Sequence, residues 1–85
     1  MYTANVTDAE NIKPKPGDTV VLIEVPPGLL NDLPIEDQHA INEVVGKPVL
    51  LNEYDDAGKA VLEFKDRNGY FHFIYVNPAF IRAVN

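Results

Sequence analysis

The sequence predicts a mainly β domain of five antiparallel strands, with one short helix in a long connection after the first strand. The first observation is a pair of matching turn signals, Asp55-Asp56-Ala57-Gly58 and Asp66-Arg67-Asn68-Gly69, each flanked by alternating apolar residues. Asp in the first position and Gly in the fourth suit a type I turn followed by a left-handed glycine, which is typical of tight β-hairpins. The second observation is a β-branched run at residues 18–25, which has the length of a strand.

The first strand is expected to follow an N-terminal arm. Residues 1–16 are polar, contain prolines at positions 14 and 16, and show no sustained periodicity, so we expect a flexible arm there. Residues 17–85 then form a single small β domain. The first strand runs to Val25, because Pro26-Pro27-Gly28 cannot continue a hydrogen-bonded ladder.

A short helix is expected between Pro34 and Gly46. Pro34 suits its first turn, Glu36 and Asp37 favour its positive end, and Gly46 suits its C-terminal cap. Its apolar side is short and consists of Ile41, Val44 and Val45. The helix is therefore expected to act as a lid over the sheet.

Three strands with short connections complete the predicted sheet, at residues 49–54, 59–65 and 70–76. A single helical turn is expected at 77–80, followed by a last strand at 81–84.

The turn type decides which side chains share a face of the sheet. Pairing of residue 55 with 59, and of 66 with 70, places on the core face Leu50, Tyr54, Ala60, Leu62, Phe64, Ile74 and Val76. The opposite face then holds Val49, Leu51, Glu53, Val61, Glu63, Lys65, Phe71, Phe73 and Tyr75. A register shifted by one residue would instead bury Phe71, Phe73 and Tyr75.

This order of elements, with the opening Lys15-Pro16-Gly17-Asp18-Thr19-Val20, resembles the Src-homology-3-like small β-barrels over residues 17–84. The resemblance implies that the sheet closes into a barrel. It also implies binding more than chemistry, since similar barrels serve as accessory domains of electron-transfer and hydratase complexes. The ALYDY-type segment and the paired tryptophans that grip proline-rich ligands are missing, which argues against that ligand. Residues 25–51 also resemble a group of small bacterial proteins that carries no activity to transfer.

Composition excludes several classes of function. The net charge of −6, with seven Lys and Arg residues, argues against a nucleic-acid partner and favours a protein with a basic surface. The chain has neither Cys nor Ser, so nucleophilic catalysis lacks its usual groups and no enzymatic activity is expected. It also has no basic leader and no long apolar run, so we expect a cytoplasmic protein that does not bind membranes.

Two apolar features are candidates for partner binding. Phe71, Phe73 and Tyr75 form an aromatic row that either contacts a protein partner or a second copy in a homodimer, or is covered by the helix or the arm. Leu29 and Leu30, in the proline-bounded loop, either insert into a partner or plug the open end of the barrel.

The main interpretation is a non-catalytic protein-protein interaction module, such as an accessory or regulatory subunit or a toxin-neutralising protein. The alternative is a small-molecule or metal-binding domain that uses the barrel mouth, lined by His39, His72 and Tyr54. A structural role for each histidine is the competing interpretation. No phosphate cradle or complete calcium loop is present, so no cofactor is expected.

Overall fold

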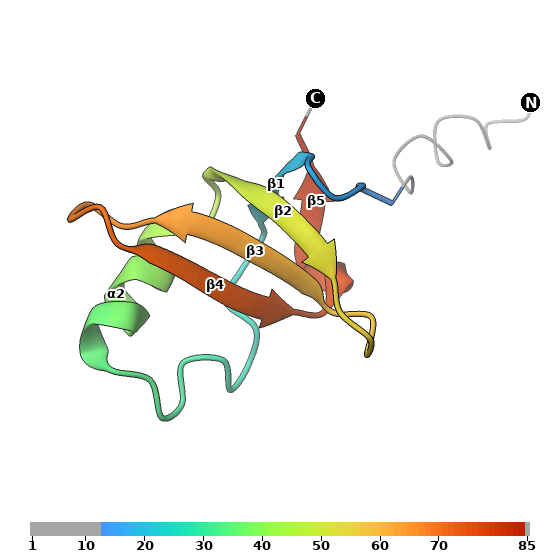
Figure 1. Cartoon of the computed structure of the whole chain (residues 1–85). Helices are drawn as coiled ribbons and strands as arrows, with labels where there is room; N and C mark the ends of the chain where they lie inside the picture. Colours follow the sequence, from blue (N-terminus) through green and yellow to red (C-terminus); the bar gives the residue numbers. More distant parts are fainter. Residues whose placement is uncertain (1–12, 85) are drawn as a thin grey trace, which may run out of the picture.

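A computed structural model describes residues 13–84 and shows one five-stranded antiparallel sheet with a helix packed against it (Figure 1). The elements in chain order are β1 (Thr19–Leu22), α2 (Ile35–Val44), β2 (Pro48–Tyr54), β3 (Ala60–Lys65), β4 (Phe71–Val76), the 3-10 turn η1 (Pro78–Phe80) and β5 (Ile81–Ala83). The strands are ordered β4-β3-β2-β1-β5 in space. The predicted mainly β class, with five antiparallel strands and a helix after the first, is confirmed.

The sheet is open among the described residues, so the barrel closure implied by the resemblance is not observed. Closure would require β5 to pair with β4 as well as with β1. The three residues of β5 pair with β1, and η1 redirects the chain between β4 and β5. β4 and β5 are therefore the two edges of the sheet.

Both hairpins use the predicted turn. In each, the Oδ1 atom of the first Asp accepts hydrogen bonds from the backbone N–H groups two and four residues later, at 2.8–3.0 Å. Gly58 and Gly69 adopt φ values of 85° and 88°, the left-handed region that glycine occupies without steric cost. The N–H of Asp55 donates to the Lys59 carbonyl and that of Asp66 to the Tyr70 carbonyl, both at 2.9 Å. The expected pairings are confirmed.

The core lies between the inner face of the sheet, α2 and the connection that precedes α2. Its buried members include Val20, Leu22, Ile41, Leu51, Leu62, Phe64, Ile74 and Val76. The prediction was wrong for the first half of β2, where Val49 and Leu51 are buried and Leu50 is 39% exposed. The register shifts between Leu51 and Glu53, so a β-bulge adds one residue to β2 and inverts the alternation there.

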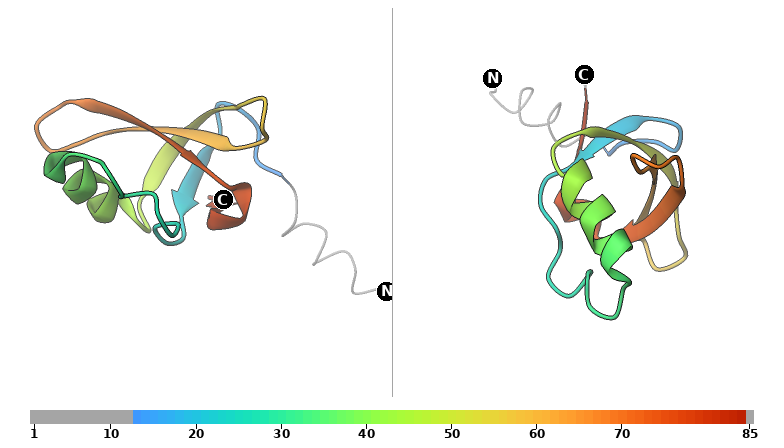
Figure 2. Two further views of the ribbon diagram at one scale, coloured as in Figure 1. Left: turned by 90° about the horizontal axis from the view of Figure 1, so that it is seen from below. Right: turned by 90° about the vertical axis from the view of Figure 1, so that its left-hand side faces the viewer.

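α2 lies under the inner face of the sheet, near the β3–β4 turn (Figure 2). Ala40 and Ile41 are its buried residues, which agrees with the expected lid. Pro34 stands at the N-cap position, and the following first turn carries Glu36 and Asp37. Within residues 13–84, no helix has the length and apolar character needed to span a membrane.

Residues 1–12 of the expected arm lie outside the described residues, but the next segment contacts the sheet. The Tyr54 hydroxyl donates to the Pro14 carbonyl at 2.8 Å, and the Gly17 N–H donates to the Leu51 carbonyl at 2.8 Å. The Lys13 ammonium lies 4.1 Å from the centroid of the Tyr54 ring. Residues 13–17 are thereby held along β2.

Candidate protein-interaction surface

Three aromatic side chains stand in a row on the outer face of the edge strand β4. Phe71, Phe73 and Tyr75 are 57%, 53% and 51% exposed, and we call them the aromatic stripe. His72, between the first two rings, is half-buried, and Ile74 and Val76 are buried, so the side chains of the strand alternate between the inner and the outer face. The structure thus gives the arrangement expected from the unshifted register, with each of the three rings more than half exposed.

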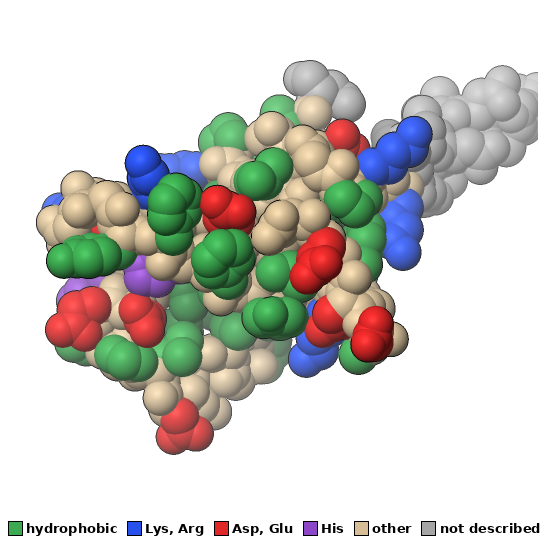
Figure 3. Space-filling view, in the orientation of Figure 1, with side chains coloured by type: hydrophobic (Ala, Val, Ile, Leu, Met, Phe, Trp, Pro, Cys, Tyr) green, Lys and Arg blue, Asp and Glu red, His purple; other side chains and the backbone are tan. Residues whose placement is uncertain are grey.

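The outer face of β3 supports the aromatic stripe. Lys65, Glu63 and Val61 lie opposite Phe71, Phe73 and Tyr75 respectively. The Lys65 ammonium is 5.1 Å from the centroid of the Phe71 ring, a cation–π contact. Val61 is 2% exposed although it faces outward, because its neighbours cover it. Figure 3 shows this face, with apolar side chains spread over the sheet and acidic ones among and beside them.

The backbone of β4 has an unpaired side. The bond from the Asp66 N–H to the Tyr70 carbonyl marks a hydrogen-bonded pair at the turn. Hydrogen-bonded and non-hydrogen-bonded pairs alternate along an antiparallel ladder, so the pairs that contain Phe71, Phe73 and Tyr75 are of the second kind. Their N–H and C=O groups point away from β3. The aromatic stripe and the free backbone groups therefore belong to the same three residues.

A pocket of about 240 Å³ lies along the inner side of β4, and we call it the edge groove. β4 supplies one wall of this groove, and the connection before α2, together with α2 itself, supplies the other. The residues that line it are Leu29, Leu33, Asp37, Ile41, His72, Phe73, Ile74 and Tyr75. The lining is mostly apolar, and Asp37 is its one side chain with a permanent charge.

His72 joins β4 to the turn beside it and to α2. Its Nε2 lies 2.9 Å from Asp66 Oδ2, and its Nδ1 lies 3.5 Å from Asp37 Oδ1. Its ring stacks on Phe64 with centroids 5.3 Å apart and an interplanar angle of 16°. The hydrogen bond from His72 is the main reason why the pKa of Asp66 lies below its usual value. These contacts are typical of a histidine with a structural role.

Leu29 and Leu30 are half-buried and pack against the core. Leu29 also lines the edge groove. Leu30 does not lie on that surface. Sequence reasoning missed Leu33, Asp37 and Ile41 as groove residues, since only the folding of α2 onto the sheet brings them beside β4.

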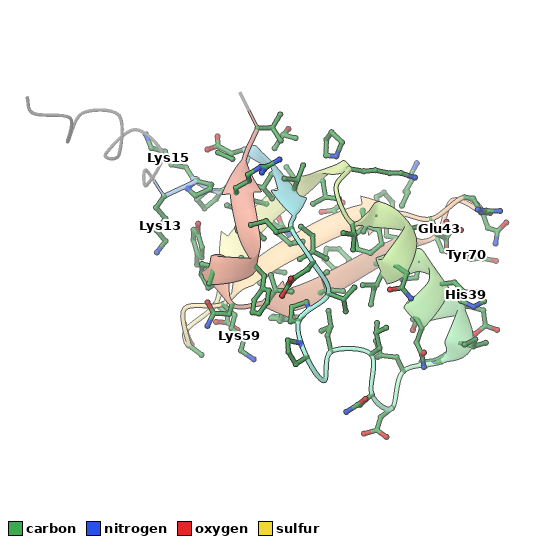
Figure 4. All side chains as sticks on the ribbon, turned by 180° about the vertical axis from the view of Figure 1, so that it is seen from behind. Lys13, Lys15, His39, Glu43, Lys59 and Tyr70 are labelled. Carbon is green, nitrogen blue, oxygen red and sulfur yellow. The ribbon has the colours of Figure 1, made fainter. Side chains whose placement is uncertain are left out.

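The residues of the alternative ligand site do not come together. His72 lines the edge groove, whereas His39 is exposed and lines a separate pocket with Glu43 and Arg67. Tyr54 is bound to Pro14, and burial together with the Asp18 charge raises the pKa of its hydroxyl. Figure 4 shows His39 at the opposite end of the molecule from Lys13, which lies over the Tyr54 ring.

Comparison with protein-family models, curated proteins and solved structures gave no match. Among residues 13–84, no group of three or more His, Cys, Asp or Glu side chains is arranged to hold a metal ion.

Proposed function

We propose that this chain is a non-catalytic, cytoplasmic protein-protein interaction module that binds a partner with a basic surface through the aromatic stripe. Accessory or regulatory subunits and toxin-neutralising proteins are of this kind. The observation that carries the proposal is a row of three aromatic rings, each more than half exposed, on an edge strand. Large aromatic residues dominate the energetics of protein interfaces, and contiguous exposed apolar patches mark contact sites.

The charge around the aromatic stripe supports a basic partner. Glu63 lies opposite Phe73, and Glu53 lies opposite Val61 on the same face. The turn after β2 adds Asp55 and Asp56, and the whole chain carries a net charge of −6. Acidic groups at the rim of an apolar patch steer a basic partner toward it and raise the rate of association.

Affinity capture with the purified full chain tests this proposal, with wild type compared to Phe73→Glu. Glu at position 73 removes the central ring of the stripe and adds a charge that would itself attract a basic partner. If Phe73→Glu no longer captures the partner, the cause is therefore the lost apolar contact and not charge repulsion. Circular dichroism and thermal unfolding establish that the variant is folded.

Ile23→Glu is the matched control, because Ile23 is 48% exposed and follows β1, which β3 and β2 separate from β4. This variant receives the same charge and should retain the partner. The proposal fails if folded Phe73→Glu captures the same proteins as wild type, or if Ile23→Glu loses them equally. Unfolding of Phe73→Glu alone would show that the ring at position 73 belongs to the core.

A further inference from the structure

We infer that β4 binds an extended segment of the partner as a sixth strand, and that this segment combines apolar residues with at least one Lys or Arg. The inference rests on the proposed interaction function and specifies how the partner is held. Strand addition uses main-chain hydrogen bonds for affinity and the alternating side chains for specificity. β4, the aromatic stripe and the edge groove supply both.

The main-chain component comes from the three stripe residues. Phe71, Phe73 and Tyr75 direct their N–H and C=O groups away from β3, as the alternation of the ladder requires. An added strand can pair with all of these groups. Its side chains beside the stripe would then contact the three aromatic rings on the outer face.

β4 also lacks the features that normally prevent edge pairing. Its sequence, Phe-His-Phe-Ile-Tyr-Val, contains no Pro and no Lys, and its register with β3 is unbroken over six residue pairs. The other edge strand, β5, has three residues and contains Arg82. Natural proteins protect sheet edges with short strands, charges, prolines and bulges, so β4 is the edge suited to accept a strand.

The side-chain component on the inner face comes from the edge groove. Every second residue of an added strand points toward this face, where the half-buried Leu29 and Leu33 offer apolar contacts. The Asp37 carboxylate also lines the groove, and 38% of its side chain is exposed. A Lys or Arg of the bound segment placed beside Asp37 would pair with this charge.

A second copy of the chain fits this edge less well than a single extended segment. The connection between β1 and α2 reaches past β4 on the inner side (Figure 1). Two-fold pairing of β4 with β4 would bring two such connections together at the shared edge. Each copy also carries a net charge of −6, so the pair would have to overcome like-charge repulsion.

Amide hydrogen exchange on the free full chain, at two protein concentrations, is the first test. The amides of Phe71, Phe73 and Tyr75 should exchange rapidly at both concentrations, whereas those of His72 and Ile74 should be protected by β3. Protection of the stripe amides that is independent of concentration would mean that the chain covers its own edge. Protection that grows with concentration would assign the edge to a second copy. Either result overturns the inference.

Selection from a display library of random twelve-residue peptides then tests the ligand chemistry. Enriched peptides should alternate apolar residues and carry Lys or Arg, and N-methylation of alternate backbone amides should abolish their binding. Binding should also protect the amides of Phe71, Phe73 and Tyr75 from exchange. Strand addition is contradicted if no peptide is enriched. It is also contradicted if the enriched peptides still bind after N-methylation in every register.

Phe73→Pro compared with Phe73→Ala isolates the backbone contribution in the protein itself. Both variants lack the ring, but Pro also lacks the outward N–H, which the β3–β4 ladder does not use. We expect Phe73→Pro to bind a selected peptide about tenfold more weakly than Phe73→Ala. Equal binding by the two folded variants overturns the inference, and the N-methylated peptides provide the same test if Phe73→Pro does not fold.

The two proposals can fail separately. In one possible result, wild type captures a partner, Phe73→Glu loses it, and Phe73→Pro and Phe73→Ala retain it equally. This result would support the interaction function and contradict strand addition. If Phe73→Glu captured every partner that wild type captures, the proposed function itself would be contradicted.

Discussion

His72 Nε2 lies 2.9 Å from Asp66 Oδ2, which ties the middle of the β3–β4 hairpin to the Asp that builds its turn. The same carboxylate uses its other oxygen to accept the N–H groups of Asn68 and Tyr70. The second nitrogen of the imidazole faces Asp37 of α2 at 3.5 Å. One side chain thereby connects the hairpin turn to the edge strand and to the helix, two of the elements that line the edge groove.

The Asp66 carboxylate should make the fold sensitive to acid. Its pKa is lowered in the folded chain, first by the hydrogen bond from His72 and then by the backbone N–H groups of Tyr70 and Asn68. A carboxyl group whose pKa falls on folding stabilises the protein above its unfolded pKa of about 3.9, and this contribution disappears as the pH falls through the lower folded value. Asp66→Asn should therefore reduce the dependence of unfolding free energy on pH below about pH 5.

Urea unfolding at a series of pH values from neutral to strongly acidic measures this effect. The stability difference between wild type and Asp66→Asn should be largest near neutral pH and should shrink as the pH falls. Asp56→Asn is the control, since Asp56 lies in the other turn, is exposed, and makes no hydrogen bond among residues 13–84. If the unfolding free energies of wild type and Asp66→Asn depended identically on pH, the acid sensitivity could not be assigned to Asp66.

The second turn should require glycine because of the left-handed backbone conformation there, and not because a side chain would clash with its neighbours. Gly69 has φ 88°, and a Cβ added there would meet nothing within 4 Å. Gly69→Ala should destabilise the fold by about 1–2 kcal/mol, because an L side chain is disfavoured in the left-handed region. Gly69→Asn should cost less, since Asn tolerates that region better than Ala. Thermal unfolding of the two variants provides the comparison, and equal stability of Ala and Asn at this position would refute it.

The hydroxyl of Tyr54 should hold the segment before β1 against the sheet. It donates to the Pro14 carbonyl at 2.8 Å, and burial together with the Asp18 charge raises its pKa. Tyr54→Phe should lower the unfolding free energy by about 0.5–1.5 kcal/mol, the usual net value of one hydrogen bond. Faster exchange of the Gly17 amide should accompany the loss. Tyr70→Phe, at a 70% exposed tyrosine, should change neither quantity.

The order of the strands along the chain and the approximate bounds of the last four could be predicted from local signals. The two Asp-first, Gly-fourth turns indicated the pairing next to each turn, and the second turn predicted the exposure of Phe71, Phe73 and Tyr75. The first strand proved shorter than predicted, ending at Leu22 instead of Val25. Beyond that point β2 and β5 supply no further partner, and pairing rather than β propensity decides where a strand ends.

The candidate site could be predicted only in part, because half of it depends on tertiary contacts. The aromatic stripe lies on one strand, so its period of two is visible in the sequence. The edge groove combines β4 with Leu33, Asp37 and Ile41, and no local pattern places these beside it. The contact of His72 with Asp37, 35 positions apart in the sequence, was equally hidden.

The bulge in β2 explains the one incorrect assignment of faces and can be tested with two neighbouring residues. Strict alternation back from Tyr54 predicts Leu50 in the core and Leu51 outside. The structure instead buries Leu51 completely and leaves Leu50 39% exposed. The extra residue between Leu51 and Glu53 causes the inversion, since it shifts the register with β3 by one position.

Leu51→Ala should therefore destabilise the fold by about 2–5 kcal/mol, because it removes a fully buried side chain and leaves a cavity. Leu50→Ala should change the unfolding free energy by less than about 0.5 kcal/mol, as expected at an exposed position. The two variants delete the same atoms from adjacent residues, so chemical unfolding of the pair isolates the effect of burial. A larger loss in Leu50→Ala than in Leu51→Ala would mean that β2 runs without a bulge and alternates strictly back from Tyr54.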